Sequence, residues 1–394
     1  MSFMINTAFK NAQRVVVKVG SNVLTGEKGL NMKNLNSISR QICNLIDEGR
    51  EVILVTSGSM AAGIRKMGIN KRPDDLPGRQ AIAAVGQAGL IMEYEKAFAK
   101  YNRKVAQILL TGQGLDNRER YLNTRNTLHT LISWGVVPII NENDTVSIEE
   151  IKFGDNDNLS AMIALLVNAD ILINLTNIDG LYTDDPRNCT DAKLIPVISA
   201  ITSDVKKMAG NIPGPLGTGG MQSKIDAAIK AGAAGIPMVI ANGGCTDILN
   251  LLFSGKSLGT FFIPSGKKLK SRKCWIGFTV KPKGSICIDS GASQAIVENG
   301  KSLLPGGIVA VNGDFPPGAP VEILSINDSI LCFMTETMTG SNSKTAIGTG
   351  LVNYSASDIR KIMGLKSSDV KKELGEKPYD EVIHRNNLVI TCHD

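Results

Sequence analysis

Residues 14–25 read RVVVKVGSNVLT, and this stretch decides the predicted fold. Its first six residues form a nearly continuous apolar run, which is typical of a strand buried on both faces of a parallel sheet. Leu35, Ile38 and Ile42 then recur at helical spacing, and the apolar run VILVT follows at 52–56. This order predicts a strand, a helix and a second, parallel strand.

The alternation of helices and strands continues downstream. Further strands are expected near 104–110, 136–140, 170–175 and 237–241, and helices near 79–100, 118–134, 157–168 and 221–232. Alternation over this length predicts an α/β domain across residues 1–264, with an open, mostly parallel sheet sandwiched by helices.

A change of pattern marks a second domain. The segment SGKKLKSRK at 265–273 is short, basic and contains glycine, so we expect a linker over residues 265–274. Beyond it, short apolar runs such as SICI (285–288) and PVEIL (320–324) are separated by proline-glycine turns. The sequence therefore predicts a small β-rich domain, with the C-terminal tail, over residues 275–394.

Composition excludes several classes of protein. With 43% hydrophobic and 20% charged residues, the chain is predicted to be globular. No apolar run reaches the ~18 residues that cross a bilayer, and no secretion signal is apparent, so we expect a cytoplasmic protein without a membrane partner. The seven cysteines form no CxxC pair and there are only three histidines, so neither a histidine-ligated metal site nor a Ser-His-Asp relay is expected.

Small polar residues follow five of the expected strands. They are GSN (20–22), SGSMAAG (57–63), NEND (141–144), TN (176–177) and NGG (242–244). Each such loop also has a purely structural explanation, because these residues often end strands. In open α/β sheets, however, ligands bind outside the carboxyl ends of the strands. The coincidence of five polar loops therefore predicts one binding crevice.

Two lysines and a glycine-rich segment indicate a phosphate site. The segment GTGGMQSK (217–224) leads into an expected helix, and its backbone N–H groups can approach an anion closely. Neither a Walker A motif nor a GxGxxG fingerprint is present. Lys224 lies in the first turn of that helix. Lys18 lies inside a buried strand and requires a charge partner, unless it snorkels from an edge strand.

The segment KFGDNDN (152–158) places Asp155, Asn156 and Asp157 just before an expected helix. Capping explains one of them, but two carboxylates so close repel unless a cation lies between them. Lysines, a glycine loop and an acidic organiser suit phosphoryl transfer, which depends on positioning and charge neutralisation. A carboxylate acceptor fits best, since its pKa of about 4.3 leaves it deprotonated at neutral pH without a general base.

With these motifs, the chain resembles the amino acid kinase family. The resemblance rests on VVVKVGSNVLT (15–25), VTSGSMAAG (55–63), QAIAAVGQAGL (80–90), RERYLNTRNTL (118–128), VVPIINENDTV (136–146), IKFGDNDNLSA (151–161), LTNIDGLYTDDPR (175–187) and GTGGMQSKIDAA (217–228). Residues 288–308 and 350–359 resemble a PUA domain. The resemblance implies the amino acid kinase fold, a PUA-like domain, and transfer of phosphate from ATP to the side-chain carboxylate of L-glutamate, the first step of proline biosynthesis.

The resemblance also implies roles for single residues. Lys18 and Lys224 would neutralise the transferring phosphoryl group, and Asp157 would hold both lysines. The residues implied to bind glutamate are Ser57, Asp144 and Asn156, with Asp155 organising the acceptor end. Those implied to line the ATP site are Lys18, Thr176, Asn177, Thr218, Gly219, Gly220, Met221, Gln222, Ser223 and Lys224. Magnesium (Mg2+) would bridge the ATP phosphates, without dedicated metal ligands from the protein.

Several alternatives stay open. Other family members act on N-acetylglutamate, aspartate or nucleoside monophosphates, but Asp144 and Asp155 supply negative charge that suits a free ammonium group. An RNA-binding protein acting through the PUA-like domain is an alternative of another class. Residues 281–394 carry 11 lysines and arginines against 13 acidic residues, a net charge of −2, which disfavours it. The resemblance further implies a homo-oligomer and proline as a feedback effector. Asn177 stands where the family usually has aspartate, and 329–349 is longer than the usual PUA connection.

Overall fold

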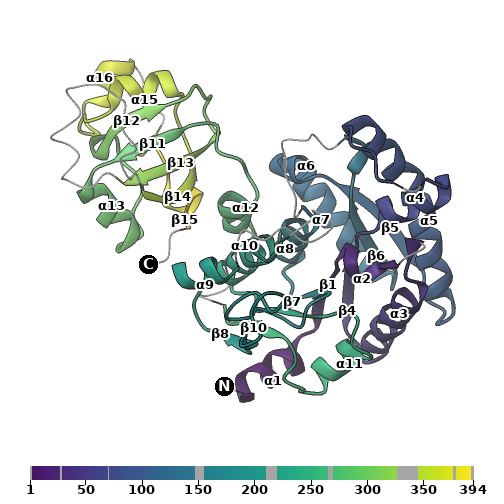
Figure 1. Ribbon diagram of the computed structural model, residues 1–394. Coiled ribbons are helices and arrows are strands. Elements are labelled where there is room, and N and C mark those ends of the chain that lie inside the picture. The colour runs from purple at the N-terminus through teal and green to yellow at the C-terminus, as the bar shows by residue number, and fades with distance from the viewer. Residues whose placement is uncertain are drawn as a thin grey trace. The chain divides into compact units, whose positions relative to one another are not determined.

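The structure is a computed structural model, which describes residues 2–26, 29–69, 71–146, 155–209, 220–264, 269–325, 345–375 and 379–391. The chain divides into two compact units, Met1–Leu269 and Lys270–Asp394. Each unit has a sheet of its own (Figure 1). The first four residues of the expected linker, 265–268, lie outside the described part of the chain.

The sheet of the first unit has eight strands in the order β5-β6-β4-β1-β7-β9-β10-β8. Their bounds are β1 (Arg14–Val19), β4 (Glu51–Val55), β5 (Val105–Leu110), β6 (Val137–Glu142), β7 (Ile171–Thr176), β8 (Val197–Ile198), β9 (Met238–Asn242) and β10 (Thr260–Phe262). Of the pairings between described strands of this sheet, only that of β9 with β10 is antiparallel. The prediction of an open, mostly parallel sheet is therefore confirmed.

Helices cover both faces of this sheet (Figure 1). Their bounds are α1 (Ser2–Asn11), α2 (Ser21–Leu24), α3 (Met32–Asp47), α4 (Ser59–Met67), α5 (Leu76–Ala99), α6 (Gly112–Asp116), α7 (Arg118–Ser133), α8 (Asp155–Val167), α9 (Ser203–Met208), α10 (Met221–Ala233) and α11 (Ile248–Phe253), with a 3-10 turn η1 (Asp144–Val146). In Figure 1, α1, α3 and α11 lie on one face of the central strands, and α8 and α10 lie on the other.

The composition of β1 follows from its central place between β4 and β7. Val15, Val17 and Val19 are buried in the core that α1, α3 and α11 complete. Successive side chains of a strand point to opposite faces, so Lys18 points to the face covered by α8 and α10. Because β1 is not an edge strand, snorkelling does not explain Lys18. It is 5% exposed and requires a partner.

One expected loop is partly helical. Residues 57–63 were expected to be a strand-end loop, but α4 begins at Ser59 after Gly58, which has a φ of +106°. The helices α4 and α5 approach each other backbone against backbone. A Cβ at Gly63 of α4 would lie 2.0 Å from the carbonyl oxygen of Ile82, and a Cβ at Gly86 of α5 would lie 1.8 Å from that of Ser59. Gly63 thus serves close packing, which turn propensity alone does not reveal.

The second unit contains a five-stranded sheet in the order β12-β11-β13-β14-β15. Its elements are β11 (Ser285–Ile288), β12 (Ile308–Asn312), β13 (Pro320–Ser325), β14 (Thr345–Leu351), β15 (Leu388–Ile390), α12 (Ser271–Phe278), α13 (Ser290–Val297), α15 (Ala356–Ile362) and α16 (Val370–Leu374). Ile286, Val321 and Ile359 are fully buried in its own core. The predicted small β-rich domain is confirmed, whereas most of 329–349 lies outside the described residues. No described helix is long and apolar enough to cross a membrane.

Candidate active site

The carboxyl ends of the central strands meet at one edge of the sheet, as the polar loops predict. Because β6, β4, β1, β7 and β9 are neighbours in that order, the loops after them lie next to one another. Backbone bonds tie them together: the N–H of Gly20 donates to Leu175 over 2.9 Å, and that of Gly243 donates to Thr176 over 2.8 Å. The polar segments that follow these strands therefore line a common edge.

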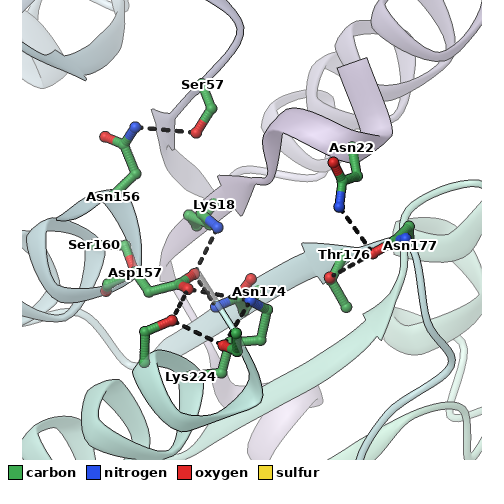
Figure 2. Close-up of polar contacts among 12 residues, drawn as sticks. Lys18, Asn22, Ser57, Asn156, Asp157, Ser160, Asn174, Thr176, Asn177 and Lys224 are labelled. Carbon is green, nitrogen blue, oxygen red and sulfur yellow. Dashed lines mark hydrogen bonds and ion pairs between the residues drawn. The ribbon is translucent and has the colours of Figure 1, made fainter. Parts of the chain in front are cut away.

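A buried carboxylate lies between two buried lysines at this edge (Figure 2). Asp157 Oδ1 lies 2.5 Å from Lys18 Nζ, and its Oδ2 lies 3.1 Å from Lys224 Nζ. The three residues come from α8, β1 and α10, and none is more than 5% exposed. The structure thus brings together the three residues that the resemblance assigned to charge neutralisation.

Two neutral donors complete the surroundings of Asp157. Asn174 Nδ2 donates to Oδ1 over 2.8 Å, and Ser223 Oγ donates to Oδ2 over 2.6 Å. Each carboxylate oxygen therefore accepts from one lysine and one neutral group. Since a carboxylate offers about four acceptor positions, those of Asp157 are fully used by the protein. Asp157 is therefore fixed in orientation and holds the lysines.

The charges in this cluster shift its ionisation. Burial would raise the pKa of the Asp157 carboxyl, but the charges of Lys18 and Lys224 and the hydrogen bonds from Lys18 and Ser223 outweigh burial and hold that pKa well below its ordinary value. Burial lowers the pKa of Lys18, and Asp157 opposes that effect. Two lysines facing one carboxylate leave excess positive charge in a space with little water, where an anion is strongly attracted.

Polar side chains on the neighbouring strand ends form a second group. Asn156 Nδ2 donates to Ser57 Oγ over 3.0 Å (Figure 2). Ser59 Oγ donates to Asp144 Oδ2 over 2.9 Å, which ties η1 to α4. The structure therefore joins Ser57 to Asn156 directly and holds Asp144 through a residue two positions from Ser57. Asp155 begins α8, and its side chain lies outside what the structure describes.

The expected nucleotide segments are described in part. Thr176 Oγ1 donates to Asn177 Oδ1 over 3.4 Å, and Asn22 Nδ2 approaches the same oxygen at 3.5 Å (Figure 2). Gly220 precedes α10, whose first turn holds Met221, Gln222, Ser223 and Lys224. Gln222 Nε2 donates to Asp226 within that helix. Thr218 and Gly219 lie outside the described residues.

Four further residues contribute to this site, and the sequence analysis assigned none of them a role of its own. Ser59 and Asn141 lie in strand-end segments that were predicted to line the crevice, whereas Asn174 and Gln87 lie outside those segments. The sequence does contain a signal for Asn174, because a polar residue inside an apolar strand needs a polar partner. The same argument applies to Lys18, which is the register partner of Asn174 on β1. Ser223 was expected to line the ATP site, and the structure adds its contact with Asp157.

Comparison with known proteins agrees with this geometry. The model of the amino acid kinase family matches residues 13–242, and that of the PUA domain matches residues 284–374. Glutamate 5-kinase of Syntrophus aciditrophicus (strain SB) is 48% identical over 381 residues, which cover 97% of this chain and 95% of that protein.

Two further relatives match to a similar extent. Glutamate 5-kinase of Thermoanaerobacter sp. (strain X514) is 47% identical over 96% of this chain and 97% of its own length. That of Geobacter sulfurreducens is 46% identical, with the same coverage of both chains. The chain therefore belongs to the amino acid kinase family, and its relatives over nearly its full length are glutamate 5-kinases.

Proposed function

We propose that this chain transfers the γ-phosphoryl group of ATP to the side-chain carboxylate of L-glutamate and forms L-glutamyl 5-phosphate, the first step of proline biosynthesis. The observation that carries the proposal is the pair of buried lysines held by one carboxylate, Lys18–Asp157–Lys224. It is supported by the relatives named glutamate 5-kinase, which match 96–97% of the chain.

The two lysines have the properties that phosphoryl transfer needs. Charge spreads over the oxygens of the transferring group in the transition state, and fixed cations stabilise it most where water is excluded. Lys18 and Lys224 approach Asp157 from different elements, so both are held before substrate arrives. Asn174 and Ser223 keep the carboxylate in place if the lysines shift toward phosphate oxygens.

The acceptor requires no general base. A side-chain carboxylate is ionised at neutral pH, so its oxygen can attack phosphorus without losing a proton. We assign glutamate to the group around Ser57, Asn156 and Asp144. Asp144, with Asp155, supplies negative charge that pairs with the positively charged ammonium group of glutamate. An acetylated amine carries no positive charge, so N-acetylglutamate would not need these carboxylates.

We assign ATP to the edge formed by Thr176, Asn177 and the start of α10 with the glycine segment before it. Magnesium, when bound, supplies further positive charge. Both oxygens of Asp157 already accept from protein donors. The metal would therefore be held by the phosphate oxygens of ATP, as is common for magnesium, and Lys18 and Lys224 would neutralise the remaining charge.

Three wider proposals accompany this function. We propose a homo-oligomer with proline as a feedback effector, and the support for both is the resemblance of the motifs to the family. The third proposal is a cytoplasmic location, which is expected from the sequence because no apolar run reaches the ~18 residues that cross a bilayer. RNA binding by the PUA domain is not part of the proposed function. The net charge of −2 over residues 281–394 does not supply the clustered positive face that RNA phosphates require.

Release of ADP, measured side by side with glutamate, aspartate, N-acetylglutamate and UMP as acceptors, tests the proposal. Hydroxylamine is added to trap the acyl phosphate as a hydroxamate. We expect ADP and hydroxamate in equal amounts with glutamate and little of either with the other acceptors. Turnover that favours N-acetylglutamate, aspartate or UMP would refute the proposed substrate.

A further inference from the structure

Three side-chain amides form a hydrogen-bonded chain beside the proposed glutamate site. Asn141 Nδ2, on β6, donates to Gln87 Oε1, on α5, over 2.7 Å. Asn156 Nδ2, on α8, donates to Asn141 Oδ1 over 3.2 Å and to Ser57 Oγ over 3.0 Å. The chain therefore leads from helix α5 to the residue that we assign to substrate binding.

The chain of amides has a direction. An amide side chain carries its donors on nitrogen and its acceptor on oxygen. Because Gln87 Oε1 accepts from Asn141 Nδ2, Asn141 turns its Oδ1 toward Asn156, which must then present Nδ2. Both hydrogens of that Nδ2 are used, one by Asn141 and one by Ser57.

The oxygen end of the Asn156 amide has no partner in the described part of the chain. Asn156 Oδ1 is buried and has no hydrogen-bond partner among the described residues. Buried acceptors are destabilising unless something donates to them. The described protein groups do not supply that donor, so the atom is available to a donor group on a ligand.

The position of Gln87 is fixed by backbone packing. Its neighbour Gly86 lies so close to α4 that a Cβ there would be 1.8 Å from the carbonyl oxygen of Ser59. The distance between α4 and α5 is therefore set by backbone atoms and not by flexible side chains. Gln87 starts the chain of amides from a rigid element, which suits a residue that orients others.

We propose that Gln87 is a positioning residue for the acceptor substrate. Through Asn141 it fixes the orientation of the Asn156 amide, so that Asn156 Oδ1 accepts a hydrogen bond from the ammonium group of glutamate. If Oδ1 and Nδ2 of Asn156 were interchanged, Nδ2 would face the ammonium group of glutamate. Both groups are hydrogen-bond donors, so glutamate would bind less tightly. Gln87 itself need not touch the substrate. This inference rests on the proposed function and names an orienting group for its substrate.

Steady-state kinetics of the full chain with ATP and glutamate test the inference. Gln87→Met keeps the length of the side chain and removes the acceptor oxygen. We expect the KM for glutamate to rise about tenfold or more, while the KM for ATP and the kcat stay within about threefold. Gln87→Glu keeps an acceptor oxygen, so it should restore the KM for glutamate to near that of the unaltered chain.

Gln41→Met is a matched control. Gln41 is also on a helix of the first unit, but its hydrogen bonds join Ser37 and the backbone N–H of Leu249, outside the chain of amides. We expect this variant to lower the Tm and to leave the KM for glutamate unchanged. If the KM for glutamate rose only because a variant is less stable, it would rise in Gln41→Met as well.

A variant of Asn141 tests whether the effect of Gln87 passes through Asn141. Aspartate at position 141 carries only acceptors, so it orients Asn156 whatever residue occupies position 87. In an Asn141→Asp background, Gln87→Met should therefore have little further effect on the KM for glutamate. If Gln87→Met does not fold, Gln87→Leu replaces it in both backgrounds.

Three results overturn the inference. They are an unchanged KM for glutamate in folded Gln87→Met, an equal rise in Gln87→Glu, and an equal effect of Gln87→Met in both backgrounds. Absence of glutamate turnover by the unaltered chain is a distinct outcome. It refutes the proposed function, and the inference falls with it.

Discussion

Lys224→Met removes one of the two cations that face Asp157 and keeps most of the side-chain volume. Lys224 Nζ lies 3.1 Å from Asp157 Oδ2 in a buried site, and Lys18 stays 2.5 Å from the other oxygen. Asp157 therefore keeps one charge partner, so we expect the variant to fold. The variant loses the excess positive charge of the site, because the Asp157 carboxylate then faces one lysine in place of two.

The expected loss follows from the buried position of the lysine. A fixed group that stabilises developing charge in a water-excluded site contributes about 2.7–4 kcal/mol, which corresponds to a fall in kcat of about 100- to 1,000-fold when the group is removed. Lys224 is 5% exposed, so water cannot readily replace its charge. We expect kcat to fall about 100-fold or more, with a smaller effect on the KM for ATP.

The assay is ADP release at saturating ATP and glutamate, with thermal unfolding measured in parallel. Lys230→Met is the matched control, since Lys230 lies on the same helix and its Nζ donates to Asn158 Oδ1 over 2.9 Å. This control should keep kcat within about threefold of the unaltered chain. A folded Lys224→Met variant with a kcat as high as the control would refute the role given to Lys224.

Three further changes follow from the structure. Asp144→Ala should raise the KM for glutamate and leave the KM for ATP nearly unchanged, because a contact to the ammonium group acts equally in the ground and transition states; a rise in the KM for ATP alone would contradict this. Gly86→Ala should lower the Tm, since its Cβ would meet backbone at 1.8 Å. Gly89→Ala on the same helix would meet no atom of the described residues within 4 Å and should be neutral or stabilising; equal Tm values for both would contradict the packing argument. A chain of residues 1–269 should stay folded and phosphorylate glutamate, because that unit has its own core and holds every proposed site residue; loss of all activity with a native circular dichroism spectrum would show that the second unit is needed.

Lys18 is a site residue whose need for a charged partner could be predicted from the sequence. A lysine inside an apolar strand had to find a partner, because an unpaired buried charge is too costly. The strand pattern placed it at the same sheet edge as the loop before Asp157. Both inferences use local periodicity and the rule for open parallel sheets. They hold because the central strands are long enough to show a pattern.

The features that sequence reasoning missed depend on packing or side-chain direction. β10 has only three residues, Thr260–Phe262, so it shows no periodicity, and its antiparallel pairing with β9 is decided in three dimensions. Residues 57–63 read as a loop because their small side chains serve the close approach of α4 and α5. The chain of amides from Gln87 to Asn156 joins three elements far apart in the sequence, and no local pattern encodes it.

The most direct test of the central claim follows an oxygen atom from glutamate to phosphate. Glutamate labelled with 18O in its side-chain carboxylate is incubated with ATP, magnesium and the chain, and hydroxylamine then cleaves the product at carbon, so that the bridging oxygen leaves with phosphate. The account predicts inorganic phosphate that carries one 18O atom, in an amount equal to the ADP formed. Release of ADP with unlabelled phosphate would mean that water, and not the carboxylate, attacks phosphorus, and it would contradict the account.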